Sequence, residues 1–141
     1  MTTDSKVKKT ENNFWPNTAT IDGARSAARQ GVWAAGFVAT VTTALAIYSR
    51  FGEAIVGVDL WALGDVILFG IIGIGIWRLS RVASVLGLGL YIAERVWMFQ
   101  ANGKLGGVLM VLLILMFVNG VRGTFAYHRL NAETTNAAKA D

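Results

Sequence analysis

The sequence contains no cysteine and only one histidine, His128. A chain without cysteine has no disulfide, no thiolate nucleophile and no cysteine-ligated metal. One histidine also cannot form a bis-histidine haem site or a multi-histidine metal centre from this chain alone. The sequence also contains no match to a catalytic triad, a metal-ligand set or a phosphate-binding loop. The sequence therefore predicts a protein that is not an enzyme and that holds no cofactor or metal.

Charged residues are also scarce. They make up 16% of the 141 residues, and hydrophobic residues make up 54%, whereas about a quarter of the residues in a soluble domain are charged. The deficit is concentrated in residues 31–127, where the apolar runs approach the length that crosses a bilayer. The net charge of +4 could suggest nucleic acid, but the basic residues flank the apolar runs. We therefore expect an integral membrane protein that contacts the lipid bilayer and not nucleic acid.

The apolar runs are separated by short polar links and predict an all-α fold, an up-down bundle of four membrane helices in residues 23–130. Short polar side chains cap the first turn of a helix, so Thr20 or Asp22 is expected to cap a helix that begins near Gly23. The four spans are expected at about 31–49, 60–77, 82–100 and 105–127.

Polar segments lie on both sides of this bundle. Residues 1–22 lack apolar periodicity and predict a disordered cytosolic tail, with Phe14 and Trp15 near the lipid headgroups. Residues 131–141 are polar and alanine-rich and are expected to be a frayed or disordered C-terminal tail.

Basic residues predict the orientation of the chain. Five Lys/Arg precede the first span, two lie in the second link and three lie in the last turn and C-terminal tail, while the first and third links hold one each. Cytoplasmic loops carry the excess of Lys and Arg. The ten basic residues on one side against two on the other place both termini in the cytosol. An even number of spans agrees with this, because it puts both termini on the same side.

The first span carries a stripe of small residues at four-residue spacing. Small side chains on one face let a second helix approach closely, which is how membrane helices associate without a hydrophobic drive. We interpret the stripe as a helix-packing face, made of Gly31, Ala35, Ala39 and Thr43.

Three charges lie inside the spans. Asp65 is about 8 Å from the start of the second span, and Glu94, beside Arg95, is about 9 Å from the end of the third. The eight Leu, Ile, Val and Phe residues of the third span contribute about −0.3 to −0.6 kcal/mol each on an insertion scale, against about +2.5 to +3.5 for each charge near the centre. The span is therefore marginal unless its charges are neutralised.

Two interpretations of this intramembrane polar cluster stay open. In the structural one, Arg95 donates to Asp65 or Glu94 and the network fixes which helices are neighbours. In the functional one, a surplus carboxylate exchanges protons or binds a cation. A second, cytosolic-side polar cluster holds Asn119 and Arg122. There Arg122 is expected to contact anionic lipid or an acidic residue of a partner.

The C-terminal half also carries a recognisable pattern over residues 77–130. It consists of Trp77-Arg78-Leu79-Ser80-Arg81-Val82-Ala83, the stretch from Tyr91 to Met98, and Asn119-Gly120-Val121-Arg122-Gly123-Thr124-Phe125-Ala126-Tyr127-His128. In this pattern the chain resembles a group of uncharacterised bacterial four-span membrane proteins with no established activity. The resemblance implies a bacterial inner membrane and assigns no site.

Two functions are compatible with these features. The first is a non-enzymatic accessory or structural membrane subunit that acts through helix contacts with another membrane protein or with copies of itself. The alternative is a small proton- or cation-coupled transporter that uses Asp65 and Glu94. Against the transporter, four-span multidrug carriers that act as dimers typically place their key carboxylate in the first span, and this chain has none there.

Overall fold

A computed structural model describes residues 15–51, 60–103 and 107–140. These residues form four α-helices and no strand, which confirms the predicted all-α fold. Most of the first link and residues 1–14 lie outside the described ranges. The helices are α1 (Ile21–Phe51), α2 (Leu60–Trp77), α3 (Arg81–Asn102) and α4 (Val108–Ala140).

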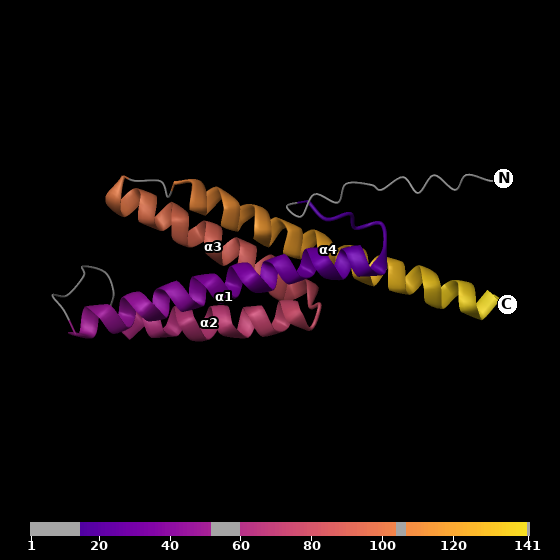
Figure 1. Ribbon diagram of the computed structural model, residues 1–141, viewed down its shortest axis with the longest axis horizontal. Helices are drawn as coiled ribbons and strands as arrows, with labels where there is room; N and C mark the ends of the chain where they lie inside the picture. The colour runs from indigo at the N-terminus through magenta and orange to yellow at the C-terminus, as the bar shows by residue number, and fades with distance from the viewer. Residues whose placement is uncertain (1–14, 52–59, 104–106, 141) are drawn as a thin grey trace, which may run out of the picture.

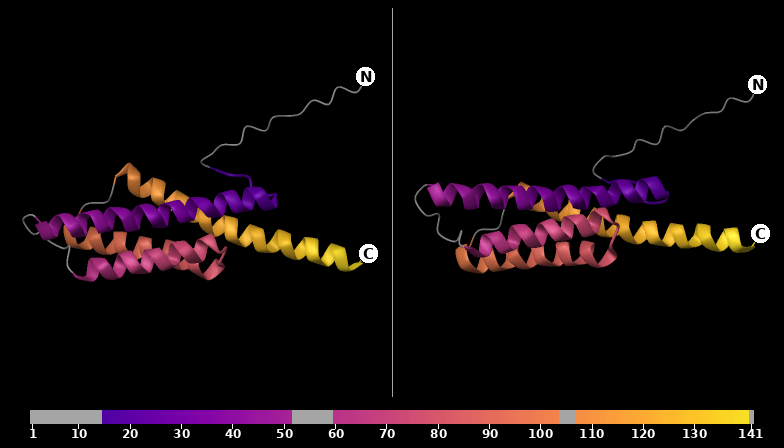
Figure 2. Two further views of the ribbon diagram at one scale, coloured as in Figure 1. Left: turned by 60° about the horizontal axis from the view of Figure 1, so that its bottom comes forward. Right: turned by 90° about the horizontal axis from the view of Figure 1, so that it is seen from below.

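The four helices run alternately up and down the long axis of the molecule (Figure 1). Each helix packs against the next one along the chain or, for α4, against α1, and α1 makes its most extensive contacts with α4 and α2. The start of α1 and the end of α4 lie at the same end, and α4 projects beyond the other helices there (Figures 1 and 2). The link between α2 and α3 lies toward this end as well.

The core lies between the helices and is built around three aromatic rings. Phe117 of α4 stands 6.3 Å from Phe69 of α2 and 5.5 Å from Tyr91 of α3 between ring centroids. All three side chains are almost completely buried. The helix α1 contributes small residues to the same core, among them Ala34 and Ala35.

The helices α1 and α4 cross obliquely and touch through their backbones at the crossing (Figure 1). A Cβ built on Gly31 would stand 2.9 Å from the Cα of Gly120, and a Cβ on Gly123 would overlap the backbone nitrogen of Ala28. Only residues without a side chain permit this approach, because a real Cβ would push the helices apart. Glycines on α4 and small residues on α1 therefore fix where the two helices meet.

Three helical stretches are long and apolar enough to cross a membrane: Ile21–Tyr48, Arg81–Ala101 and Val108–Lys139. The apolar stretch of α2, Gly64–Trp77, is shorter and is not among these three. Large apolar side chains on all four helices are exposed, including Ile67, Trp97 and Val108. In water such a surface would associate or aggregate, whereas lipid chains can cover it. The chain has the composition and shape of a membrane protein.

Local hydrogen bonds explain where the helices begin and end. Thr20 Oγ1 accepts the Gly23 amide at 3.1 Å, so Thr20, one of the two predicted caps, begins α1. Ser80 Oγ accepts the Ala83 amide at the start of α3. Gly103, with a φ of 64°, ends α3 in the left-handed conformation that glycine adopts most easily.

The turn between α2 and α3 uses leucine where glycine is usual. Leu79 has a φ of 61°, and its amide bonds the Ile76 carbonyl while the Ser80 amide bonds the Gly75 carbonyl. This pair of bonds is a Schellman motif, which normally places glycine in the left-handed position. The turn therefore carries local backbone strain at Leu79.

The structure differs from the sequence prediction in the two tails. Residues 15–20, expected to be disordered, form a turn in which Pro16 is buried and Asn17 Oδ1 accepts the Ala19 amide. Residues 131–140, expected to be frayed, continue α4. Alanine favours helix, and an Arg129–Glu133 ion pair one turn apart adds a small stabilisation.

Candidate functional site

Asp65 lies on the exposed surface of α2, about one and a half turns from the start of that apolar helix. Among the described residues, the one ion pair within 4 Å joins Arg129 to Glu133, so Asp65 has no such partner in this part of the chain. A carboxylate on the apolar surface of a membrane helix is costly, and such residues usually face a cavity or another protein chain.

Glu94 and Arg95 follow one another on α3, and both side chains are half-buried. The Arg95 guanidinium stands 4.9 Å from the ring centroid of Tyr91, one helical turn earlier, in cation–π geometry. Its Nε is buried and has no hydrogen-bond partner among the residues that the structure describes. Arg95 is therefore held by an aromatic face, with part of its hydrogen-bonding capacity unused.

The predicted intramembrane cluster is an arrangement of neighbours and not of direct contacts. Glu94 lies within electrostatic range of both Asp65 and Arg95, although no ion pair within 4 Å joins any two of the three. Glu94 thus has a second carboxylate and a guanidinium as neighbours, toward the end of the bundle where α3 ends. Whether they act as a structural network or as an exchange site stays a prediction.

The second predicted cluster connects three parts of the chain. Asn119 of α4 is almost completely buried, and its Nδ2 donates to Oε1 of Gln30 on α1 at 2.7 Å. Its Oδ1 accepts Nη1 of Arg122 at 3.0 Å. The Arg122 guanidinium also stacks 3.9 Å from the ring centroid of Trp15. This arrangement ties the segment before α1 to α4.

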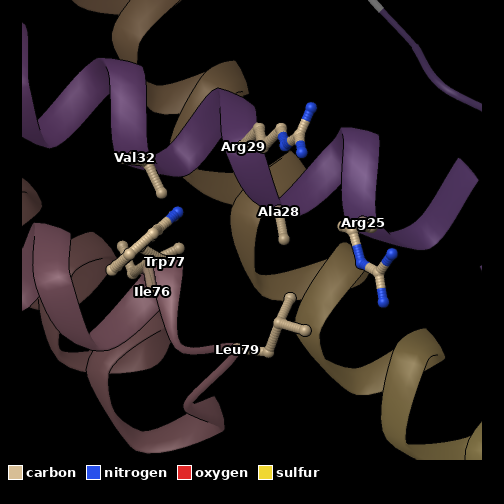
Figure 3. Close-up of a pocket in the computed structure, with 7 residues that line it drawn as sticks. All are labelled: Arg25, Ala28, Arg29, Val32, Ile76, Trp77 and Leu79. Atoms are coloured by element: carbon tan, nitrogen blue, oxygen red, sulfur yellow. The ribbon is translucent and has the colours of Figure 1, made fainter. Parts of the chain in front are cut away.

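A cavity of about 350 Å³ lies beside this region, between α1 and the end of α2 (Figure 3). In the close-up, Arg25 points down from α1 on the side of Leu79, and the Trp77 ring lies under Val32. Arg29 points to the other side of α1, with its guanidinium turned away from the apolar lining residues. The lining residues are Arg25, Ala28, Arg29, Val32, Ile76, Trp77 and Leu79.

Arginines gather at this end of the bundle. We call it the arginine-rich end and define it by Arg25, Arg29, Arg78, Arg81 and Arg122. Two of these guanidinium groups lie over aromatic rings of α4, Arg25 at 5.6 Å from the centroid of Tyr127 and Arg81 at 5.3 Å from that of Phe125. None of the five has an ion-pair partner within 4 Å among the described residues.

Two polar contacts join α4 to the start of α3. Nε2 of His128 lies 2.9 Å from the Leu79 carbonyl oxygen, which can only accept, so this nitrogen donates. The buried hydroxyl groups of Ser84 and Thr124 lie 2.8 Å apart. Each of these hydroxyls also reaches a carbonyl of its own helix, at Arg81 and Val121.

The predicted packing stripe on α1 lies against α2 and α4 along its first half. Gly31 contacts Gly120 of α4, and Ala35 is fully buried, with its Cβ 3.5 Å from where a Cβ of Gly73 would be. Ala39 and Thr43 are half-buried, and Thr43 Oγ1 donates to the Ala39 carbonyl at 2.7 Å.

Several residues of these sites were not singled out from sequence. Gln30 and Asn119 are 89 positions apart, and no local pattern indicates that they meet. Ser84 and Thr124 had a weak signal, because each is a hydroxyl residue within a largely apolar helix. Arg25 and Arg29 were counted for topology only, and their part in lining a cavity depends on the packing of α1 against α2.

Comparison of this chain with models of known protein families, with curated proteins and with solved structures finds no match. The described residues contain no group of three or more His, Cys, Asp or Glu that could hold a metal ion.

Proposed function

We propose that this chain is a four-span protein of a bacterial inner membrane, an accessory or structural subunit that acts through lateral helix contacts and not as an enzyme. The observation that carries the proposal is Asp65, an exposed carboxylate on an apolar helix with no ion-pair partner within 4 Å in the described chain. A helix from another membrane protein, or from a second copy, would supply the missing donor.

The fourth crossing and the orientation belong to the same proposal. At 18 residues α2 is about 27 Å long, close to the roughly 30 Å of a hydrocarbon core. With α2 as a span, both ends of the bundle domain lie in the cytosol, as the ten basic residues against two favour. The bacterial inner membrane is an expectation from the resemblance over residues 77–130.

Photo-cross-linking from single cysteines tests the lateral contact, because the natural chain contains no cysteine. Leu68 lies about 60° around α2 from Asp65, and Ile67 lies about 160° away at nearly the same depth. Both side chains are exposed. A benzophenone on Leu68→Cys should capture one protein species in membranes, and the same label on Ile67→Cys should capture much less.

Two outcomes decide this proposal. Adding Asp65→Asn to Leu68→Cys should reduce the yield of the adduct, since the partner's donor would lose the carboxylate it pairs with. Adducts with lipid alone, at both positions alike, would contradict a protein partner at this face.

The transporter remains a second candidate, favoured by one observation. Glu94 and Asp65 lie within electrostatic range of each other, and among the described residues Arg95 is the basic side chain that acts on Glu94 there. Two carboxylates beside one guanidinium leave a net negative charge that a proton or cation could neutralise. Cation-driven or proton-driven flux in proteoliposomes that disappears in Glu94→Gln would support this candidate over the subunit.

A further inference from the structure

The cavity at the arginine-rich end has an opening and a floor of different chemistry. Its seven lining residues include two arginines and no acidic side chain. Arg25 and Arg29 are one helical turn apart on α1, and in Figure 3 Arg25 points toward the side of Leu79 while Arg29 points away from the apolar floor. Neither has an ion-pair partner within 4 Å in the described chain. The lining therefore supplies two arginine side chains and no carboxylate to compete for them.

The floor is apolar. Ala28 and Val32 of α1 face Ile76 of α2 and Leu79 of the following turn across it (Figure 3). The Trp77 side chain, 69% exposed, lies at one edge. Tryptophan is enriched where a membrane meets water, because its ring is apolar and its N–H is polar. A ligand that matches both parts must be an anion joined to an apolar body.

The position of the cavity along the helices further restricts which class of anion it can bind. Three of the helices are long and apolar enough to cross a membrane, and the cavity lies where α1 changes from apolar to basic residues. Basic pockets between membrane helices at this level bind the headgroups of anionic lipids. At about 350 Å³ the cavity is at the small end of ligand pockets, so it can take a headgroup and the start of the acyl chains and not a whole lipid.

We propose that this cavity is a binding site for an anionic phospholipid, with the phosphate held by Arg25 and Arg29 and the glycerol and upper acyl region against the floor. Guanidinium groups bind phosphate oxygens through charged, often paired hydrogen bonds. The Arg25 guanidinium also lies over the Tyr127 ring, 5.6 Å from its centroid, and this contact restrains it. A second copy of this chain is a poor occupant, because its own arginine-rich end would repel this one. The site depends on membrane residence and not on the lateral contact at Asp65.

Native mass spectrometry of the full chain, released from detergent micelles with added lipid, tests the site. The wild type should retain phosphatidylglycerol in preference to phosphatidylcholine. The pair Arg25→Gln and Arg29→Gln should lower the apparent affinity for phosphatidylglycerol roughly 30-fold, since each basic side chain near an anionic membrane contributes roughly a factor of five. The matched control is Arg129→Gln, which removes an exposed arginine outside the cavity and should change the affinity little.

Three results would overturn the proposal. Equal retention of the two lipids by the wild type would remove the preference for an anion. An equal loss in Arg129→Gln would show general surface attraction. Displacement of phosphatidylglycerol by millimolar inorganic phosphate would mean that the site takes a free anion and that the floor is not used.

A second variant covers the case in which the glutamine pair does not fold. Val32→Trp fills the floor and leaves both arginines in place, so it should also abolish selective retention of phosphatidylglycerol. Unchanged retention in Val32→Trp would exclude the cavity as the binding site.

Discussion

Gly31 on α1 and Gly120 on α4 are in backbone contact, because a Cβ built on either residue would stand 2.9 Å from the Cα of the other. The two helices make their most extensive contact with each other. The position of this contact decides how Gln30 meets Asn119 and where the cavity at the arginine-rich end lies. The crossing therefore places both polar regions at that end of the bundle.

Gly31→Ala should destabilise the bundle by about 1–3 kcal/mol, the usual cost of forcing a methyl group into a closed contact. Gly36→Ala is the matched control on the same helix, since a Cβ there meets nothing within 4 Å. Alanine also favours helix over glycine, so the control should be neutral or slightly stabilising. Thermal unfolding in detergent measures both, and equal shifts would contradict a specific crossing point.

The sequence allowed the helices to be predicted but not all of their pairings. Apolar runs of bilayer length and the cap at Thr20 are local features, and they located α2, α3 and the starts of α1 and α4 to within a few residues, whereas α4 continues to Ala140, well beyond the expected fourth span. The small-residue stripe on α1 was visible too. That Gly31 meets Gly120 of α4 while Ala35 meets Gly73 of α2 depends on the crossing angle, which no local pattern contains. The turn at residues 15–20 was not predicted, because it is held by tertiary contacts such as that of Trp15 with Arg122.

The candidate sites were predictable to different degrees. Asp65, Glu94 and Arg95 stand out because a charge within an apolar run is costly wherever the helix packs. Their mutual distances were not predictable, since the spacing between α2 and α3 is set by large and small residues in the core. The contact of Arg95 with Tyr91 follows from four-residue spacing on one helix, whereas the cavity needs two helices and a turn to form.

A pair of substitutions tests the hydrogen bond between Ser84 and Thr124. Each hydroxyl has one hydrogen and also reaches a carbonyl of its own helix, so losing one partner does not leave the other without an acceptor. Ser84→Ala and Thr124→Val should each cost roughly 0.5–1 kcal/mol, in the range of hydrogen bonds between membrane helices. The double variant should cost less than the sum of the two. Strict additivity in unfolding experiments would argue against the bond.

The strain at Leu79 can be measured by comparing two truncations. Leu79→Ala and Leu79→Gly both remove the side chain that lines the cavity, but only alanine keeps a Cβ at a φ of 61°. The left-handed conformation costs roughly 1–2 kcal/mol for a residue with a Cβ, and the greater freedom of unfolded glycine offsets about 0.5–1 of this. Leu79→Gly should therefore unfold at a higher temperature than Leu79→Ala. The reverse order would mean that the turn is not strained.

The polar cluster gives the sharpest test of whether Arg95 has a structural or a functional neighbour. Arg95→Met removes the charge while keeping an extended apolar side chain, so Glu94 loses the guanidinium that acts on it. Removing one partner of a buried pair costs about 3–5 kcal/mol. These groups are half-buried or exposed and are not in direct contact. We therefore expect Arg95→Met to lower the free energy of unfolding by roughly 1–3 kcal/mol. Arg95→Lys keeps the positive charge and should cost less than Arg95→Met.

Rescue of Arg95→Met identifies the carboxylate that depends on Arg95. Glu94 is half-buried on the same helix, whereas Asp65 is exposed, so Glu94→Gln should restore most of the stability and Asp65→Asn little. That pattern makes Arg95 the internal counter-charge of Glu94. It leaves Asp65 to pair with a partner outside the chain, as the proposed function as a membrane subunit requires. Rescue by Asp65→Asn alone would show that the Arg95 guanidinium neutralises Asp65. In that case there is no reason for a lateral partner at α2. Glu94 would then be the carboxylate able to exchange a proton or cation.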